Sequence, residues 1–313
     1  MGQLRRALKT DPGVFWRKMA GYDEIITVAL RRRKANKTIL EDVSSPFTCI
    51  RYSDKFWYAD PLIFEKDGKS FLFVEAYDRD INRGCIAAGE LGENPEDFDP
   101  KTVIREDYHM SFPYVFSWGD QIFMIPETGD NWTVNLYKAE EFPYQWVKVQ
   151  EFKTKSRVVD VIVQDISDDR VMLSGSYLSE ENGLYTGFMK LILVRAGDTY
   201  SLSIEDDKVE YNLRDRNAGG LFYSGDRLFH PTQESTETDY GVYINICDEA
   251  GTSFRVAPED VNINGIENAR RIGVHTYSLS DTVEAIDVRY LRFSAKTWSR
   301  RVRKLWKKSR GFC

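Results

Sequence analysis

The chain has 313 residues, a formal net charge of −6, and 13% aromatic residues. No stretch approaches the ~20 apolar residues that a membrane-spanning helix requires, and the basic N-terminus lacks the apolar core of a secretion signal. The four cysteines are scattered without a CxxC pair, which argues against a zinc site and a disulfide framework and favours a reducing, cytoplasmic location.

Charge is distributed unevenly along the chain. Residues 1–40 hold ten Lys or Arg and three Asp or Glu, a net +7, and residues 292–313 hold nine Lys or Arg and no acid, a net +9. This leaves −22 for residues 41–291. An acidic body with two basic ends is not typical of a nucleic-acid-binding protein, so no nucleic-acid partner is predicted.

After a basic N-terminal extension, residues 1–46, the first predicted structural unit is a hairpin. The segment "KFWYADPLIFEKDGKSFLFVE" (Lys55 to Glu75) places two apolar runs about the turn Lys66-Asp67-Gly68. The same layout returns downstream at a spacing of ~45–60 residues, which four-stranded propeller blades produce. The later copies cover residues 111–127, 158–177, 217–233 and, less clearly, 268–293.

We therefore predict an all-β fold, a five-bladed β-propeller over residues 47–295. A pair of β-sandwiches would not explain why the hairpin recurs with similar chemistry at its first strand. Because the first strand of each blade lines the central channel, the residues that open these strands are expected to converge at one mouth. Those residues are Asp60, Pro113, Asp160, Gly219-Gly220 and His275, and the residues expected to ring them are Glu75, Glu127, Arg216, His230 and Gln233.

Several short motifs keep a specific order: "FWYADPLIFEKDGKSFLFVE", "SFPYVF", "NLYKAEEFPYQW", "VVDVIV", "RNAGGLF", "LFHPTQ", "DYGVYINI" and "GVHTYS". Over residues 47–290 this string resembles the propeller domain at the N-terminal side of glucosamine inositolphosphorylceramide transferases. Bacterial relatives of that domain occur among surface-polysaccharide proteins. The domain is in turn similar to the five-bladed propeller glycoside hydrolases of the arabinanase, xylosidase and invertase clan.

The resemblance implies catalytic acids on the channel. Those hydrolases use an Asp that opens the first blade, a second Asp that tunes its pKa, and a Glu acid. Asp60 matches the first position and Asp160 the second. No later blade opens with a Glu, so the acid would be Glu127 or Glu75, from a second strand.

Three functions remain open at this stage. The first is glycosyl transfer to a glycan or lipid-linked acceptor, with Asp60 as base and cations at a departing phosphate. The second is glycoside hydrolysis by Asp60, Asp160 and a Glu. The third is a glycan-binding module that accompanies a transferase, since fold alone does not decide function. The predicted cations are Arg214, Arg216 and His230, and the other predicted substrate contacts are Glu75, Gln233, Tyr240 and His275.

Each candidate also has a structural interpretation. Asp60 can simply cap turn amides at the start of a strand, and His230 and His275 can be hydrogen-bonded core residues. His109 lies in a loop stretch and is expected to be exposed. No pair of histidines has metal-ligand spacing, so neither a metal nor a cofactor is predicted.

The C-terminal residues 296–313 form a distinct basic tail. Trp298, Val302, Leu305 and Trp306 follow helical spacing and leave Lys and Arg on the other faces. This pattern is typical of an amphipathic helix at an anionic membrane surface. A helix that covers one propeller face and a solvated tail are the alternatives. The predicted location is cytoplasmic, with peripheral attachment to the inner membrane face.

Overall fold

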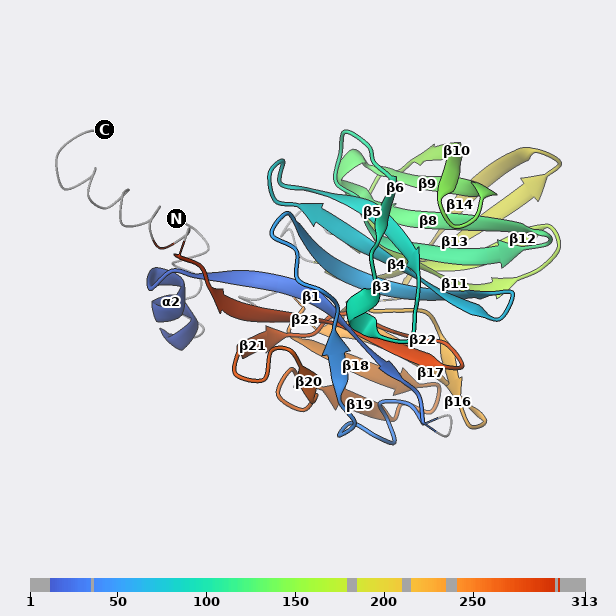
Figure 1. Cartoon of the computed structure of the whole chain (residues 1–313). Helices are drawn as coiled ribbons and strands as arrows, with labels where there is room; N and C mark the ends of the chain where they lie inside the picture. Colours follow the sequence, from blue (N-terminus) through green and yellow to red (C-terminus); the bar gives the residue numbers. More distant parts are fainter. Residues whose placement is uncertain are drawn as a thin grey trace, which may run out of the picture.

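The computed structural model describes residues 12–34, 37–178, 185–209, 215–234, 241–295 and 298. It is nearly all-β, with five sheets arranged as the blades of a propeller, as predicted (Figure 1). Short helices flank the strands: α2 (Pro12–Met19), η1 (Pro95–Asp97) and η2 (Gly129–Asn131). Among the described residues, no helix has the length and apolar character that a membrane span requires.

The first three blades are four-stranded antiparallel meanders, each built from consecutive strands. Alternating apolar residues and short turns favour this pairing of sequence neighbours. Blade 1 contains β3 (Phe56–Lys66), β4 (Lys69–Asp78), β5 (Arg83–Glu90) and β6 (Lys101–Ile104). Blade 2 contains β7 (Ser111–Trp118), β8 (Gln121–Thr128), β9 (Thr133–Glu141) and β10 (Gln145–Lys153). Blade 3 contains β11 (Val158–Ile166), β12 (Arg170–Leu178), β13 (Tyr185–Ala196) and β14 (Thr199–Val209).

The last two blades have an interrupted innermost strand. In blade 4, Gly219 separates two short strands, and a Cβ on this glycine would lie 1.9 Å from the carbonyl oxygen of Tyr277. Blade 4 contains β15 (Asp215–Asn217), β16 (Phe222–Ser224), β17 (Arg227–Glu234), β18 (Tyr243–Asp248) and β19 (Ser253–Val256). Blade 5 contains β21 (Arg270–Gly273), β22 (Tyr277–Leu279), β23 (Val283–Phe293), β1 (Tyr22–Arg32), β2 (Phe47–Cys49) and β20 (Ile263–Asn264).

The ring is closed by the N-terminal strand. All of β1 pairs antiparallel with β23, from Tyr22 opposite Phe293 to Arg32 opposite Val283, and the two strands run side by side in Figure 1. The predicted boundary at residue 47 is therefore wrong, because residues 22–32 belong to the fifth blade. Sequence patterns reveal local hairpins, whereas this pairing joins strands at opposite ends of the chain.

A buried ion pair holds the closing strand. Arg31 on β1 donates to Glu284 on β23 at 2.5 Å, and the other Glu284 oxygen accepts from the backbone N–H of Ile39 at 2.7 Å and from the Tyr277 hydroxyl. Both charged side chains are buried. We refer to Arg31, Glu284 and Tyr277 as the closure cluster.

The innermost strands of blades 1 to 3 share a backbone irregularity. Asp60, Phe112 and Asp160 have φ values of 49°, 43° and 50°, and each lies where its strand skips register against the second strand. A left-handed non-glycine residue is uncommon, and such bulges re-aim side chains. In blade 2 the counterpart of Asp60 is Phe112, one residue before Pro113, which was expected to open this strand towards the channel.

Of the predicted C-terminal tail, the structure describes Trp298. This residue packs against Gly21, where an added Cβ would lie 2.7 Å from the Trp298 Cβ, and its indole is about half exposed. Gly21 has a φ of 99°, which favours glycine. The other residues predicted to form the tail helix lie outside the described residues, so membrane attachment stays a prediction.

Candidate functional site

The site lies where the bulges of the innermost strands face the channel. Asp60 on β3 is 5% exposed. Its Oδ2 accepts a hydrogen bond from the backbone N–H of Phe112 at 3.1 Å, and its Oδ1 accepts one from the Thr276 hydroxyl at 2.9 Å. These donors come from blades 2 and 5, so the Asp60 carboxylate links three blades at the channel. The simple capping role for Asp60, within its own strand, is therefore not what the structure shows.

His275 lies between two carboxylates. Its Nδ1 is 2.9 Å from Asp287 Oδ1, and its Nε2 is 3.4 Å from Asp60 Oδ1. Burial alone would lower the pKa of His275, but the charges of Asp287 and Asp60 outweigh burial, so the pKa is raised. Asp287 on β23 also accepts from the backbone N–H groups of Asp60, His275 and Thr276.

The spacing of these three side chains is compatible with a metal site. One ligand atom from each of Asp60, His275 and Asp287 lies within 4.8 Å of the others. Within the described structure both Asp287 oxygens accept backbone N–H hydrogen bonds, and Oδ1 also lies against the His275 ring. The arrangement is better described as a hydrogen-bond network that fixes the Asp60 carboxylate.

A second group is centred on Arg216 in blade 4. Its guanidinium binds both oxygens of Asp160, with Nη2 at 2.7 Å from Oδ1, and Nη2 also donates to Glu127 at 2.9 Å. Such bidentate pairs are strong and directional. Arg216, Asp160 and Glu127 therefore form one buried assembly across blades 2, 3 and 4, as their predicted convergence required.

Two amides and an imidazole support this assembly. Gln233 donates to Asp160 Oδ2 at 3.3 Å and to the Asn217 carbonyl at 3.1 Å. The Asn217 amide donates to the Asp160 carbonyl at 2.7 Å, so its Oδ1 is left to accept from His230 Nε2 at 2.8 Å. Burial lowers the pKa of His230 to about 4. A neutral His230 does not supply the cation predicted for a phosphate.

Glu75 is the carboxyl with the most distinctive electrostatics. Burial raises its pKa well above the usual range, and the charges of Asp60, Glu127 and Asp287 raise it further. Five carboxyl groups, those of Asp60, Glu75, Glu127, Asp160 and Asp287, lie close together in the described part of the site, and Arg216 lowers the pKa of Glu75 less than burial and the neighbouring acids raise it. This excess of acid favours a protonated Glu75 at neutral pH.

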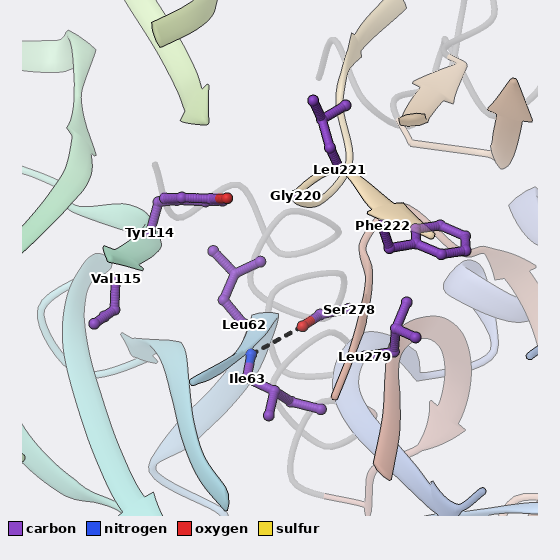
Figure 2. Close-up of a pocket in the computed structure, with 9 residues that line it drawn as sticks. All are labelled: Leu62, Ile63, Tyr114, Val115, Gly220, Leu221, Phe222, Ser278 and Leu279. Carbon is purple, nitrogen blue, oxygen red and sulfur yellow. Dashed lines mark hydrogen bonds between the residues drawn. The ribbon is translucent and has the colours of Figure 1, made fainter. Parts of the chain in front are cut away.

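The lining of the channel changes from polar to apolar two residues beyond Asp60 and Asp160, at Leu62 and Ile162. Leu62, Phe112 and Ile162, from three blades, pack into an apolar cluster next to the bulges. Beyond it lies a pocket of about 170 Å³, and Figure 2 shows Tyr114 directed towards Gly220 across it. The polar site thus has an apolar floor. The pocket residues are Leu62, Ile63, Tyr114, Val115, Gly220, Leu221, Phe222, Ser278 and Leu279.

Most predicted site residues that the structure describes meet in this channel, whereas Tyr240 and Arg214 lie outside the described residues. Three contributors were missed by the sequence reasoning: Asp287, Thr276 and Asn217. Thr276 and Asn217 neighbour predicted residues in the motifs "GVHTYS" and "RNAGG", which offered a signal. Asp287 is on the second strand of blade 5, within "EAIDVRY". The signal available in the sequence was a single Asp between the apolar residues Ile286 and Val288.

The fold places the chain in the class of five-bladed β-propellers. The chain is similar to an α-L-arabinofuranosidase from Lactobacillus brevis, with a TM-score of 0.51 and 15% identity over 74% of this chain and 89% of that one. It is also similar to the α-L-arabinofuranosidase PaAbf62A from Podospora anserina, with a TM-score of 0.50 and 9% identity over 77% and 94%. At such identities the likeness shows the fold alone.

The sequence comparison is more specific. Residues 34–250 match the family Glucosamine inositolphosphorylceramide transferase 1, N-terminal, and the chain belongs to this family, as its motifs predicted. The Arabidopsis thaliana protein of that name is 31% identical over 103 residues, which are 33% of this chain and 13% of that protein. The Oryza sativa subsp. indica protein is 26% identical over 107 residues, 34% and 14% respectively. The chain thus matches a small part of these relatives.

Proposed function

We propose that the channel binds a glycosyl unit and transfers it to an acceptor hydroxyl on a glycan or lipid-linked molecule during the assembly of a surface glycan. Membership of a family named for a glycosyl-transferring protein supports this proposal. The observation that carries it is the pair of carboxyl groups in one buried channel. Asp60 is an acceptor fixed by donors from blades 2 and 5, and burial together with neighbouring acids raises the pKa of Glu75, which favours its protonated form.

The two carboxyl groups have complementary roles in this reaction. Asp60 accepts the proton of the acceptor hydroxyl while the hydroxyl oxygen bonds to the anomeric carbon. Glu75 gives its proton to the oxygen that leaves the same carbon. Gln233 Oε1 is buried without a hydrogen-bond partner among the described residues, and a sugar hydroxyl would supply the missing donor.

The role expected for Arg216 at a donor phosphate is revised. Two carboxylates already compensate its charge, and the acidic surroundings oppose a diphosphate. A donor whose leaving oxygen needs a proton, such as a glycoside, fits better than a nucleotide sugar. Hydrolysis is the second candidate function, favoured by the same protonated Glu75, because water can take the place of the acceptor.

Substitution of Asp60 tests the proposal. Asp60→Asn keeps the side-chain shape and suits the left-handed backbone, so it should fold yet lose about 10²- to 10⁴-fold in turnover, the usual contribution of a general base. The matched control is Asp67→Asn, since Asp67 also has a positive φ but lies in an exposed turn of the same blade. Mass spectrometry of products formed from glycan and aryl-glycoside donors, with and without acceptor, separates transfer from hydrolysis. Saturable sugar binding that survives Asp60→Asn, without turnover of any donor, would leave the binding module instead.

A further inference from the structure

His109, in the loop between β6 and β7, contacts the acid of the site. It was expected to be exposed, but its side chain is 29% exposed and its Nε2 lies 3.5 Å from Glu75 Oε1. We propose that His109 is a positioning residue that faces Glu75 with an N–H group and so places the proton of the acid on Oε2. This inference rests on the proposed function for the role of Glu75.

A backbone contact identifies which nitrogen of His109 carries the proton. The backbone N–H of Gly84 donates to Nδ1 at 2.9 Å, and the N–H of Met110 donates to the Gly84 carbonyl at 3.1 Å. Because a backbone N–H can only donate, Nδ1 must be unprotonated. The proton of the neutral imidazole is then on Nε2, the atom nearest Glu75. Burial lowers the pKa of His109, which keeps the ring neutral.

The approach of His109 to Glu75 requires a glycine at position 84. An added Cβ there would lie 2.4 Å from the Met110 carbonyl oxygen, 2.6 Å from Glu75 Oε1 and 2.8 Å from His109 Cε1. Such distances exclude any side chain without displacement of one of these groups. The close contact between the His109 imidazole and the Glu75 carboxyl group therefore depends on the absence of a side chain at Gly84.

The loop that carries His109 is fixed from two blades. The Tyr108 hydroxyl accepts from Asn135 at 2.7 Å, and Glu106 accepts from the Tyr137 hydroxyl at 2.8 Å, both donors being on β9 of blade 2. Arg83 of blade 1 donates to the Glu106 carbonyl at 3.2 Å. These bonds precede His109, and the Met110 N–H bond to the Gly84 carbonyl follows it, so the chain is held on both sides of the ring, as a positioning role requires.

The position of His109 decides which oxygen of Glu75 carries the proton. With a protonated Nε2 next to Oε1, the carboxylic proton is better placed on Oε2, and the same N–H stabilises the carboxylate after proton donation. The contact is long for a hydrogen bond, and such contacts commonly shorten when substrate binds. The charged groups facing Glu75 are Asp60 on β3, Glu127 on β8, Asp287 on β23 and Arg216 on β15, and those facing His109 are Asp60, Asp130, Arg157 and Arg216.

The test measures protonation directly, so it does not depend on turnover. Imidazole ¹⁵N shifts should show His109 as the neutral Nε2–H tautomer at pH 7. The carboxyl ¹³C resonance of Glu75, assigned by its loss in Glu75→Gln, should titrate about one pH unit higher in His109→Phe than in the wild-type protein. His109→Gln is the matched control, because its amide can accept from Gly84 and donate to Glu75 and should restore the wild-type midpoint.

The outcomes separate the two proposals. A doubly protonated or Nδ1–H imidazole at pH 7, or an unchanged Glu75 midpoint in a folded His109→Phe protein, would overturn the positioning role. If the midpoint moves as expected and no glycosyl turnover is found for any donor, His109 controls Glu75 as inferred while the proposed function fails. If turnover is found, the alkaline limb of its pH–rate profile must shift in His109→Phe by the same amount as the titration midpoint of Glu75.

Discussion

At the scale of single residues, the site is created by backbone geometry as much as by side-chain identity. Asp60, Phe112 and Asp160 adopt the same left-handed conformation in three successive blades. Two of these positions hold an acid, and the third holds a buried aromatic residue whose N–H binds Asp60. A repeated irregularity can therefore supply either a reactive group or the donor that positions one.

The sequence pattern predicted Asp60, Asp160 and His275 at the openings of their blades and Glu75 and Glu127 at the ends of second strands, but it placed Pro113 rather than Phe112 at the equivalent position of blade 2. It could not show that Arg216 would be compensated by both Asp160 and Glu127, because each hydrogen bond joins separate blades. His109 was misplaced for a similar reason. Its burial depends on Gly84, which is distant in sequence and carries no pattern of its own.

Glu75 should make the folded protein less stable at neutral pH. Its pKa is raised in the folded state by burial and neighbouring acids, so the folded chain binds more protons than the unfolded chain above pH 4.5. Stability therefore falls as pH rises through that range. We expect Glu75→Gln to raise the thermal midpoint by a few degrees at pH 7, with little difference from wild type near pH 4.

Thermal unfolding followed by circular dichroism at both pH values checks this expectation. Glu140→Gln, at an exposed position, is the matched control and should behave as wild type at both. A Glu75→Gln protein that gains nothing at pH 7 would show that Glu75 is not held protonated in the fold.

At the scale of elements, the blades differ in whether their strands are neighbours in the sequence. Blades 1 to 3 consist of neighbouring strands, and their hairpins were predicted from apolar runs about short turns, which contain Gly in blades 1 and 2 and Asp in blade 3. Blade 5 instead takes β1 and β2 from the N-terminal region. Residues 1–46 were assigned to an extension because their basic charge was visible, whereas their partner strand lies more than 200 residues away.

Truncation tests the contribution of β1. A chain that begins at residue 20 keeps β1 and should unfold cooperatively. A chain that begins at residue 47 loses β1 and leaves Glu284 of the closure cluster buried without Arg31. Loss of one partner of a buried ion pair costs about 3–5 kcal/mol, in addition to the apolar contacts of the strand. We expect the shorter chain to lose its cooperative transition.

Urea unfolding of the two chains gives the comparison, and a synthetic peptide of residues 20–50 should restore the transition to the shorter one. Equal midpoints for both truncations would mean that the ring is stable without its closing strand.

At the scale of the whole molecule, charge is separated between an acidic propeller and basic ends. The eight Lys and Arg between Lys296 and Arg310 would each contribute about 1 kcal/mol near an anionic leaflet. We expect deletion of residues 296–313 to abolish sedimentation with anionic liposomes at moderate salt. Zwitterionic liposomes serve as the control, and unchanged binding after the deletion would reject a membrane role for this segment.

The pairing of β1 with β23 also has a consequence for synthesis on the ribosome. The strands of the other four blades lie between β1 and its partner β23 in the chain, so β1 is synthesised before them and must wait while those blades form. During this interval its apolar residues and open backbone groups are available to chaperones or to the wrong sheet edge. Completion of the ring thus follows the synthesis of the other four blades and requires β1 and β23 together.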